Sequence, residues 1–478
     1  MAWYPVIGLE VHIQLDVTSK LFSTSPTVFG AQPNSQASFI DLGLPGTLPI
    51  VNKAAIKQAI RFGFATNSKV NSEVTFDRKN YFYPDLPKGY QITQHYNPLL
   101  WGGHIDIDLA DGEKKRIRIH HTHMEEDAGK SLHDYRHDMT GIDLNRAGMP
   151  LLEVVSEPDM RSAEEAIQFL KTLHNLVVFL GVSDGNMQEG SLRCDANISI
   201  RDGLDAPFGT RVEVKNINSF KYIEKAINYE IARQADVLSS GGTIRQQTRL
   251  YDESQGVTKL MRDKEEAHDY RYIPEPDIPP IHLDDAIIHA IKAELPELPR
   301  DKMQRYMNEY DLSEYDASIL AYDRHYAHYF EQMMGYDHPN PAKMVANWIL
   351  GPLSAALNRD NISLADSDMK PDMLHQLLSR IEDGTISNNI AKNVFEQMCQ
   401  TQESADEIIE SKGLKLITDE KAILKIIDTV ITNNPTQVEA YKAGNVKLFG
   451  FLVGQCMKLS QGKVHPGKLN ALLKEKFD

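Results

Sequence analysis

Carboxylates and a histidine interrupt several short apolar stretches of this sequence. Glu10 and His12 lie two residues apart near the N-terminus, and Glu153, Asp195 and Glu213 each stand within a run of aliphatic or β-branched residues. Residues two apart on a β-strand project from the same face. Glu10 and His12 are therefore candidates for binding one cation together. The alternative is that they form the polar side of an edge strand.

A denser polar group follows at residues 120–127, where three histidines and three acidic residues, including Glu125, occur within eight positions. Such residues ligate metals or act as general bases. The same composition is also typical of an exposed turn whose charge changes with pH. Both interpretations stay open for this segment.

The repetition of acids inside apolar strands favours a shared ligand. Burying a bare carboxylate is costly, and a single such residue is usually satisfied by structural partners. Five strands that each carry one are better explained by one shared cation. Ligands that are mostly oxygen favour Mg²⁺ or Mn²⁺ over Zn²⁺. His12 binds Mn²⁺ better than Mg²⁺, or it reaches the metal through water.

Residues 76–92 combine basic and aromatic side chains on a restrained backbone. Lys79 and Lys88 lie among tyrosines and phenylalanines, and Pro84 and Pro87 limit the conformations of the loop. Charge and stacking together suit a phosphate or an acylated nucleotide end. The alternative is a rigid aromatic surface loop.

Several familiar classes of protein are excluded or disfavoured. Gly129-Lys130-Ser131 resembles half of a phosphate loop, but Met124 stands where the motif requires glycine. The three cysteines are widely spaced, which argues against a disulfide framework or a CxxC zinc site. The N-terminus has no basic and apolar leader, and no apolar run approaches the ~18 residues of a membrane span. We therefore expect a cytoplasmic protein without a membrane partner.

The pattern along the chain predicts an α+β fold followed by helical regions. Strand signals dominate residues 1–292, and the proline run 272–280 is expected to be an extended segment near the end of this first domain. Helices are predicted in the first domain at 53–64, 163–180 and 222–238, and beyond it at 301–309, 313–323, 342–357, 370–383 and 387–401. The expected domains are 1–292, a helical domain at 293–410, and a small helical tail at 411–478.

Charge is distributed unevenly between these parts. The formal net charge is −16, yet residues 412–478 contain eleven lysines and six acidic residues, a net +5 that leaves −21 for the remainder. A basic end on an acidic body suits a protein that touches phosphates with its tail. A modest lysine excess is also typical of an ordinary solvated surface.

Several longer motifs resemble those of a known family. The stretches DRKNYFYPDLPKGYQI, VIGLEVHIQL, HMEEDAGKSLHD, DLNRAGMPLLEVVSEPDM, GSLRCDANISI and VEVKNINSF, and the tail GQCMKLSQGKVHPGKLN, are similar to the GatB family of aspartyl/glutamyl-tRNA(Asn/Gln) amidotransferases, in that family's order. The resemblance covers essentially the whole chain. It implies a cradle-shaped, kinase-like catalytic domain without a phosphate loop, then a helical domain and a tail.

The resemblance also implies an activity and its participants. With ATP and Mg²⁺ (or Mn²⁺), a GatB protein phosphorylates the side-chain carboxylate of Glu-tRNA(Gln) or Asp-tRNA(Asn). Ammonia from a glutaminase (amidase) subunit then gives the amide, and a small third subunit completes a heterotrimer. The matching positions imply a metal site of Glu10, His12, Glu125, Glu153, Asp195 and Glu213, catalytic roles for Glu125, Lys79 and Lys215, and tRNA contacts from Lys447, Lys458, Lys463 and Lys468.

Two other functions remain as alternatives. Besides the ligase subunit that the resemblance implies, the chain could be a non-catalytic tRNA-binding or assembly subunit whose acids are structural. A self-contained amide synthetase is disfavoured because the sequence lacks an amidase serine–lysine set.

Overall fold

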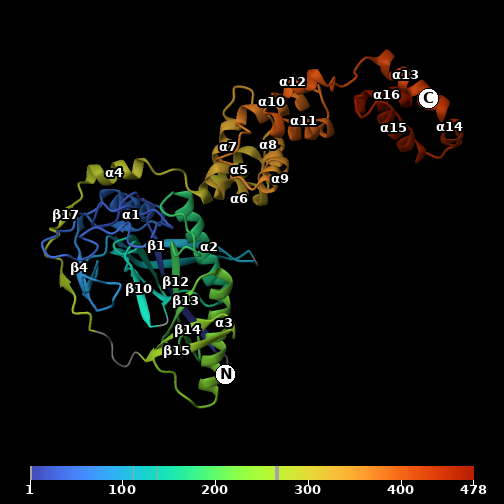
Figure 1. Ribbon diagram of the computed structural model, residues 1–478. Coiled ribbons are helices and arrows are strands. Elements are labelled where there is room, and N and C mark those ends of the chain that lie inside the picture. Colours follow the sequence, from blue (N-terminus) through green and yellow to red (C-terminus); the bar gives the residue numbers. More distant parts are fainter. Residues whose placement is uncertain (1–2, 111, 137, 264–268, 478) are drawn as a thin grey trace. The chain divides into compact units, whose positions relative to one another are not determined.

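The computed structural model describes residues 3–110, 112–136, 138–263 and 269–477 (Figure 1), and the chain forms two compact units, Met1–Leu298 and Pro299–Asp478. The first unit combines a large mixed sheet with helices, and the second is helical. The predicted α+β fold class is confirmed. No helix among the described residues is both long and apolar enough to cross a bilayer.

A mixed sheet forms the framework of the first unit, and its central strand is β1 (Tyr4–Gln14). Strand β1 lies between β11 and β12 and pairs antiparallel with both. The sheet has the order β15-β14-β13-β12-β1-β11-β8-β6-β2, with β7 paired to β8. Its other strands are β2 (Lys69–Val70), β6 (Leu100–Trp101), β7 (His104–Asp108), β8 (Lys114–Glu126), β11 (Pro150–Ser156), β12 (Leu192–Arg201), β13 (Val212–Ile217), β14 (Gln247–Asp252) and β15 (Val257–Asp263).

The two faces of the central strand have different environments. Ile7, Leu9, Val11 and Ile13 are fully buried in the main hydrophobic core, as their alternation on the strand requires. This core includes residues of α1 (Lys53–Ala65), α2 (Ala163–Phe179) and α3 (Phe220–Ser239), and Figure 1 shows α2 and α3 alongside the sheet. The opposite face of β1 carries Glu10 and His12. The helices therefore leave a polar face of the sheet available for chemistry.

The helices begin where the sequence places capping residues. The side chains of Ser162 and Ser219 accept hydrogen bonds from backbone N–H groups of the first turns of α2 and α3. Asn52 does the same for α1. All three helices predicted in the first domain are present, with ends that differ by no more than two residues from the prediction.

The proline-rich segment 272–280 contains no helix, as predicted, and is extended at residues 273–274, but it turns at residues 276–278. Its strand β16 (Ile273–Pro274) pairs with β4 (Asp77–Asn80), and β17 (Ile281–His282) pairs with β3 (Glu73–Val74). The buried carboxylate of Glu275 accepts two hydrogen bonds of 2.8 Å from the Arg78 guanidinium. β4 is thus fixed between the proline-rich segment and β5 (Tyr90–Thr93), which positions the following residue of the strand, Lys79.

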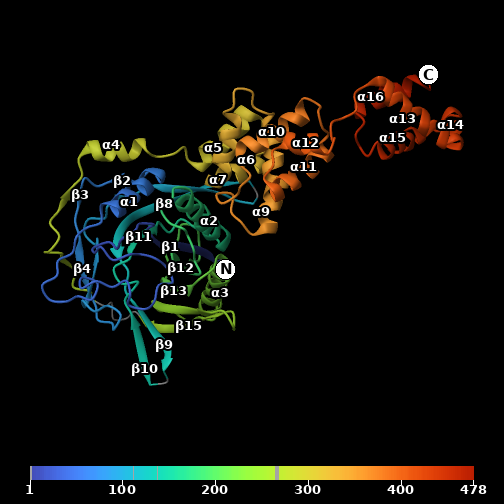
Figure 2. The ribbon, with the colours of Figure 1, turned by 45° about the horizontal axis from the view of Figure 1, so that its top comes forward.

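Two further elements complete the first unit. A hairpin of β9 (Lys130–Arg136) and β10 (Met139–Asp143) extends away from the large sheet, as Figure 2 shows. Lys130 begins a strand here rather than a helix, so Gly129-Lys130-Ser131 does not form the loop-to-helix structure of a phosphate loop. The short α4 (Asp285–Ala293) contributes Ile291 to the main core.

The second unit contains two separate hydrophobic cores. The first is formed by residues between Tyr306 and Ile409, and the second by residues between Ile423 and Leu473. Its helices are α5 (Pro299–Tyr310), α6 (Glu314–Tyr322), α7 (Arg324–Met334), α8 (Ala342–Trp348), α9 (Ser354–Asp360), α10 (Pro371–Glu382), α11 (Asn388–Thr401), α12 (Ala405–Ser411), α13 (Glu420–Asn433), α14 (Pro435–Lys442), α15 (Leu448–Leu459) and α16 (Pro466–Glu475).

One predicted helix is interrupted. The sequence pattern predicts a continuous helix over 342–357, but a π-helical turn at Ile349–Leu353 separates α8 from α9. Pro352 lies within this turn and has no N–H to continue an α-helical ladder. The prediction of a continuous helix was wrong because it followed the helical spacing of the apolar residues and gave too little weight to Pro352.

Candidate active site

Three side chains from neighbouring strands form the first polar group on the polar face of the sheet. His12 of β1 stands directly opposite Glu153 of β11, and Glu125 comes from β8, the next strand along. The Nε2 atom of His12 lies 3.1 Å from a carboxylate oxygen of Glu153 and 3.5 Å from one of Glu125. We call His12, Glu125 and Glu153 the first group.

His123 adds a fourth side chain beside the first group. Its Nε2 lies 3.5 Å from Glu153 and 3.8 Å from Glu125. It is two residues before Glu125 on β8 and therefore on the same face. The sequence pattern singled out its segment but not this histidine in particular. The period-two relation to Glu125 was the signal that would have identified it.

Burial and charge act against each other within the first group. Burial alone would lower the pKa of His12, but the carboxylates of Glu153 and Glu125 raise it to about 9. Burial would raise the pKa of Glu153, yet the two histidines and Lys79 hold this pKa far below its ordinary value. The pKa of Glu125 is lowered too, because His123, His12 and Lys79 outweigh its burial. Both carboxylates are therefore ionised at neutral pH.

A second polar group lies on the same strand, two residues from the first. Glu10 of β1 stands opposite Asp195 of β12, and Glu213 comes from β13, the strand beyond. Asn197 donates a hydrogen bond of 2.9 Å to Glu10, and Lys215 bonds to Asp195 and lies 3.1 Å from Glu213. Glu10, Asp195 and Glu213 are the second group.

Carboxylates of both groups repel the charge on Glu10. Burial and the nearby carboxylates of Glu153 and Glu213 raise the pKa of Glu10. The pKa of Lys215 is also raised, to a value at which the amine stays protonated, because Asp195 and Glu213 outweigh its burial. The Lys215 ammonium thus already offsets part of the negative charge in this group.

The structure gives the arrangement of the six predicted metal ligands. The six predicted ligands divide into two groups of three, and within each group one ligand atom per residue lies within 4.8 Å of the others. His12 and Glu10 are two residues apart on an extended strand, which separates their Cα atoms by about 7 Å. Ligands two residues apart on one face of a strand can bind the same ion, so the same-face rule holds, and a cation shared by both groups stays a prediction.

Both groups have donor sets that fit a hard divalent cation. Carboxylate oxygens dominate each of them, as Mg²⁺ and Mn²⁺ prefer, and the single imidazole favours Mn²⁺ at the first group. A cation would also relieve the repulsion between Glu10 and its neighbours. His12 and Lys215 carry the compensating positive charge in the structure described here.

Lys79 lies between two pockets. One, of about 270 Å³, is lined by Lys79, His123, Glu125, Glu153 and also by Trp101 and Tyr272. The other, of about 500 Å³, is lined by Lys79, Tyr81, Tyr83, Tyr270 and Arg262 among others. The burial of Lys79 works to lower its pKa, but Glu125, Tyr272 and Glu153 raise it, so the amine is charged.

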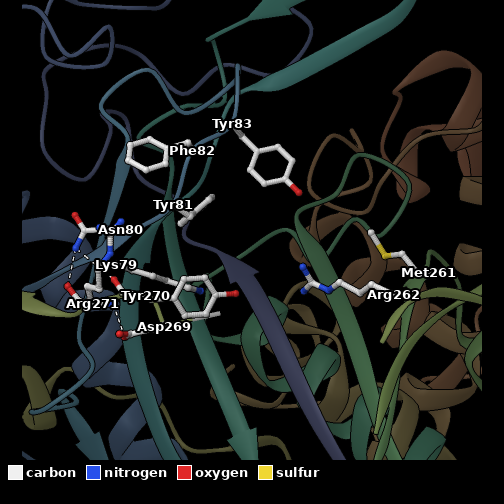
Figure 3. Close-up of a pocket in the computed structure, with 10 residues that line it drawn as sticks. All are labelled: Lys79, Asn80, Tyr81, Phe82, Tyr83, Met261, Arg262, Asp269, Tyr270 and Arg271. Atoms are coloured by element: carbon white, nitrogen blue, oxygen red, sulfur yellow. Dashed lines mark hydrogen bonds between the residues drawn. The ribbon is translucent and has the colours of Figure 1, made fainter. Parts of the chain in front are cut away.

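The larger pocket is lined by aromatic and basic side chains. Figure 3 shows Lys79 and Tyr270 close together and Arg262 and Met261 on the facing wall. The Lys79 ammonium lies 4.9 Å from the centre of the Tyr270 ring. Such a combination suits a base and its phosphates. Tyr270 and Arg262 lie far along the chain from Lys79, and the sequence pattern did not identify them.

Comparison with known proteins gives the family. The sequence model of the GatB/GatE catalytic domain matches residues 5–289, and that of the GatB domain matches residues 328–477. The B subunit of the aspartyl/glutamyl-tRNA(Asn/Gln) amidotransferase of Thioalkalivibrio sulfidiphilus is 55% identical over 477 residues, and that of Alkalilimnicola ehrlichii is 54% identical over 478. Both alignments cover 100% of each chain. The chain belongs to the GatB family.

The match to GatB proteins confirms the resemblance read from the motifs. It extends over both polar groups, since these lie within the matched catalytic domain. The GatB relative from Coxiella burnetii is similarly close, at 54% identity over 477 residues. The names of these relatives describe them as parts of a larger enzyme.

The tail of this GatB family member carries the four lysines predicted to contact tRNA. Lys447, Lys458 and Lys468 are exposed and Lys463 is partly buried. Lys463 and Lys468 lie near residues 417–418, to which their backbone or side chain bonds. Lys447 and Lys458 are near opposite ends of α15, about 16 Å apart along its axis. The four lysines are therefore spread over the tail rather than gathered at one point.

Proposed function

We propose that this chain is the component of a tRNA-dependent amidotransferase that activates the side-chain carboxylate of a misacylated aminoacyl-tRNA with ATP. The observation that carries the proposal is the first group, in which ionised Glu125 and Glu153 lie beside His12 and Lys79 at the wall of a pocket. In reaction class this chain is part of a carbon–nitrogen ligase.

The proposed reaction has two steps. A side-chain carboxylate oxygen of Glu-tRNA(Gln) or Asp-tRNA(Asn) attacks the γ-phosphorus of ATP, and the bond from that phosphorus to ADP breaks. Ammonia then attacks the carbonyl carbon of the acyl phosphate, the carbon–oxygen bond to phosphate breaks, and a proton is lost. Phosphorylation is needed because the oxygen of a free carboxylate is a poor leaving group.

The charged residues account for how such a substrate pair is held. A carboxylate and a triphosphate repel each other, and lysines offset that repulsion. Lys79 is charged and faces both pockets, so it is placed to contact phosphate. Lys215 is bound to the second group and acts there by balancing charge. At the first group, a bound Mg²⁺ or Mn²⁺ would supply charge neutralisation of the transferring phosphoryl group.

The protonation state of Glu125 decides between two roles for this residue. A general base works best when its pKa lies near the operating pH, and the pKa of Glu125 is lowered instead. This supports Glu125 as a metal ligand and fixed negative charge rather than as the base that deprotonates ammonium. The same argument applies to Glu153.

The partners belong to the same proposal. The chain works with a glutaminase (amidase) subunit that supplies ammonia and with a small third subunit, in a heterotrimer. Its tail and helical domain hold the tRNA, with Lys447, Lys458, Lys463 and Lys468 as contacts to phosphates. The expected cytoplasmic location stays a prediction from the sequence.

The alternative of a non-catalytic assembly protein gives the acids a structural role. Structural acids in a sheet are expected to find permanent neutral or cationic partners, as Glu275 does with Arg78. Glu125 and Glu153 also have cationic neighbours, but they lie beside each other and line a pocket, which a purely structural ion pair does not require. This arrangement supports the catalytic proposal.

A substitution in the assembled enzyme tests the proposal. The complex carrying Glu125→Gln should lose ATP-dependent activation, by about a hundredfold or more, because one carboxylate ligand of the proposed cation is gone. Its glutaminase activity and tRNA affinity should be retained. Glu224→Gln on the exposed surface of α3 is the matched control. Unchanged product formation with Glu125→Gln would reject this site.

A further inference from the structure

A buried hydroxyl group lies beside the second group, on the strand next to Glu213. Thr248 of β14 is the register neighbour of Glu213 on β13, and these two strands run parallel. The Thr248 hydroxyl donates a hydrogen bond of 2.9 Å to Oε2 of Glu213, and the whole residue is buried. Because no part of Thr248 reaches solvent, it acts on this carboxylate rather than on a substrate.

The hydroxyl at position 248 is not explained by packing. Valine is close to threonine in shape and is at least as common in buried strands. Burying a hydroxyl costs free energy unless it finds a hydrogen-bond partner, and here that partner is Glu213. The polar atom of Thr248 is therefore best explained by its effect on the Glu213 carboxylate.

The two oxygens of the Glu213 carboxylate have different neighbours. Oε2 accepts the hydrogen bond from Thr248, whereas Oε1 lies 3.1 Å from the Nζ atom of Lys215. Lys215 also bonds to Asp195 on β12, the strand between β13 and β1. The hydroxyl thus holds Oε2 on the side of β14, and Oε1 is on the side of the other ligands of the second group.

Glu10, the ligand from the central strand, is held by a similar contact. The side-chain amide of Asn197 donates a hydrogen bond of 2.9 Å to Oε1 of Glu10. Asn197 and Thr248 are neutral donors, while Lys215 is a charged one. A neutral donor does not oppose the charge of a cation that binds to the other oxygen of the same carboxylate.

This difference in charge determines which contacts can persist when a metal ion binds. A cation at the second group displaces the Lys215 ammonium, because two positive charges at short distance repel each other. The Thr248 hydroxyl can stay on Oε2 of Glu213 while Oε1 binds the ion. Partners that orient a ligating side chain commonly change metal affinity by about ten- to a hundredfold.

We propose that Thr248 is a positioning residue that presents one oxygen of Glu213 to the cation of the second group. This inference rests on the proposed function, in which that group binds a divalent metal. Without the hydroxyl, the Glu213 carboxylate can rotate and place both oxygens beside Lys215, and the ammonium then competes better with the ion. Thr248 itself contacts neither the cation nor the substrate.

Replacement of the hydroxyl tests this role without removing a charge. Thr248→Val should lower the Mn²⁺ affinity of the second group by about tenfold, as measured by an electron paramagnetic resonance titration of the full chain. Thr248→Ser keeps the hydroxyl and should retain most of that affinity. Glu10→Gln removes a ligand and so identifies the Mn²⁺ that belongs to this group. Mn²⁺ bound at the first group is the internal reference.

Thr258 offers a matched control in the same sheet. It is a buried threonine of β15 whose hydroxyl donates a hydrogen bond of 3.0 Å to the buried carboxylate of Glu230 on α3. Glu230 also accepts hydrogen bonds from Arg233 and Gln234 and belongs to neither polar group. Thr258→Val removes the same kind of contact, so it should lower the melting temperature and leave the Mn²⁺ affinity unchanged.

The outcomes separate positioning from a purely structural role. A loss of Mn²⁺ affinity in Thr248→Val that serine restores supports the inference. Unchanged Mn²⁺ affinity of Thr248→Val, whatever its melting temperature, would overturn the inference and leave the metal site standing. If Glu10→Gln removes no bound Mn²⁺, the inference fails together with the metal assignment of the second group. Thr248→Ala, which also lacks the hydroxyl, replaces Thr248→Val if that variant does not fold.

Discussion

His12 of β1 and Glu153 of β11 face each other across two antiparallel strands, with the imidazole Nε2 3.1 Å from the carboxylate. The pair is nearly buried, and Glu125 completes a triangle of side chains around it. Cross-strand neighbours on one face are fixed by sheet register. Any shift of β1 by one residue would exchange this polar group for core side chains.

The first group should bind Mn²⁺ more tightly than the second. In the first group the positive charge is on His12, which becomes a ligand once it releases its proton, whereas in the second group Lys215 has to be displaced from Asp195 and Glu213 before a cation binds. An electron paramagnetic resonance titration of free Mn²⁺ should show a tight class of sites that Glu153→Gln removes and a weaker class that Glu10→Gln removes. Retention of the tight class by Glu153→Gln would contradict this assignment.

Replacement of Lys215 should change the weaker class alone. Lys215→Met removes the competing ammonium, so Mn²⁺ affinity of the second group should rise by about tenfold, in line with removal of one positive charge from a partly buried site. The tight class is the internal control in the same titration. A loss of affinity at the second group would show that Lys215 supports metal binding instead.

Lys79 should contribute to catalysis through its charge. Lys79→Met should lower kcat/KM for ATP by about a hundredfold, because one cation beside the phosphates is removed. Lys79→Arg keeps the charge beside Tyr270 and should recover part of that loss. Steady-state kinetics with saturating aminoacyl-tRNA measures both variants. Equal activity of Lys79→Met and Lys79→Arg would argue against a charge effect.

The tail should affect tRNA binding more than ATP use. It has its own hydrophobic core, with Ile423, Ile427 and Leu452 fully buried, so deletion of residues 412–478 leaves the core of the first unit untouched. We expect weaker tRNA affinity and a smaller salt dependence of binding, since lysine contacts to phosphate release counterions. Filter binding at several salt concentrations measures this. Equal affinity of the truncated and full-length chains would defeat the prediction.

Asp159 should give the first unit a stability that depends on pH. Its burial acts to raise its pKa, but hydrogen bonds from the Arg118 guanidinium, at 2.7 and 2.9 Å, lower this pKa below the ordinary value. A group with a lowered folded-state pKa stabilises the fold above its unfolded pKa, near 4, and loses this effect as pH falls further.

Thermal melts of Asp159→Asn against the unchanged protein follow this effect. The variant should melt at a lower temperature at pH 7, and the difference should shrink below about pH 4, where the unfolded carboxyl is protonated. Arg118→Gln should behave in the same way. A difference in melting temperature that stays constant down to pH 3 would show that the Asp159 charge is not the cause.

Much of the fold followed from local sequence patterns. Period two placed Glu10 and His12 on one face of β1, with Ile7, Leu9 and Val11 buried on the other, and the helices predicted in the first domain are present. These features depend on neighbours along the chain. The π-helical turn at Pro352 was missed because the periodicity of its surroundings is helical.

The division of the site into two groups was not predictable in the same way. It depends on which strands lie beside β1, namely β11 on one side and β12 on the other, and strand order is a tertiary property. For the same reason the contact between Tyr270 and Lys79 could not be predicted from the sequence. The two residues meet because the proline-rich segment pairs with β4. The alternation along each strand predicted which side chains share a face of the sheet. Which strands lie side by side, and so which of these side chains meet, depends on the topology of the fold.

The transfer of an oxygen atom tests the central claim most directly. Misacylated tRNA labelled with ¹⁸O in the side-chain carboxylate is converted to the amide by the full complex with unlabelled ATP, and the released phosphate is analysed by mass spectrometry. If the carboxylate is phosphorylated, each phosphate carries one ¹⁸O atom from the substrate. Phosphate without label, formed while amide accumulates, would contradict carboxylate activation by this chain.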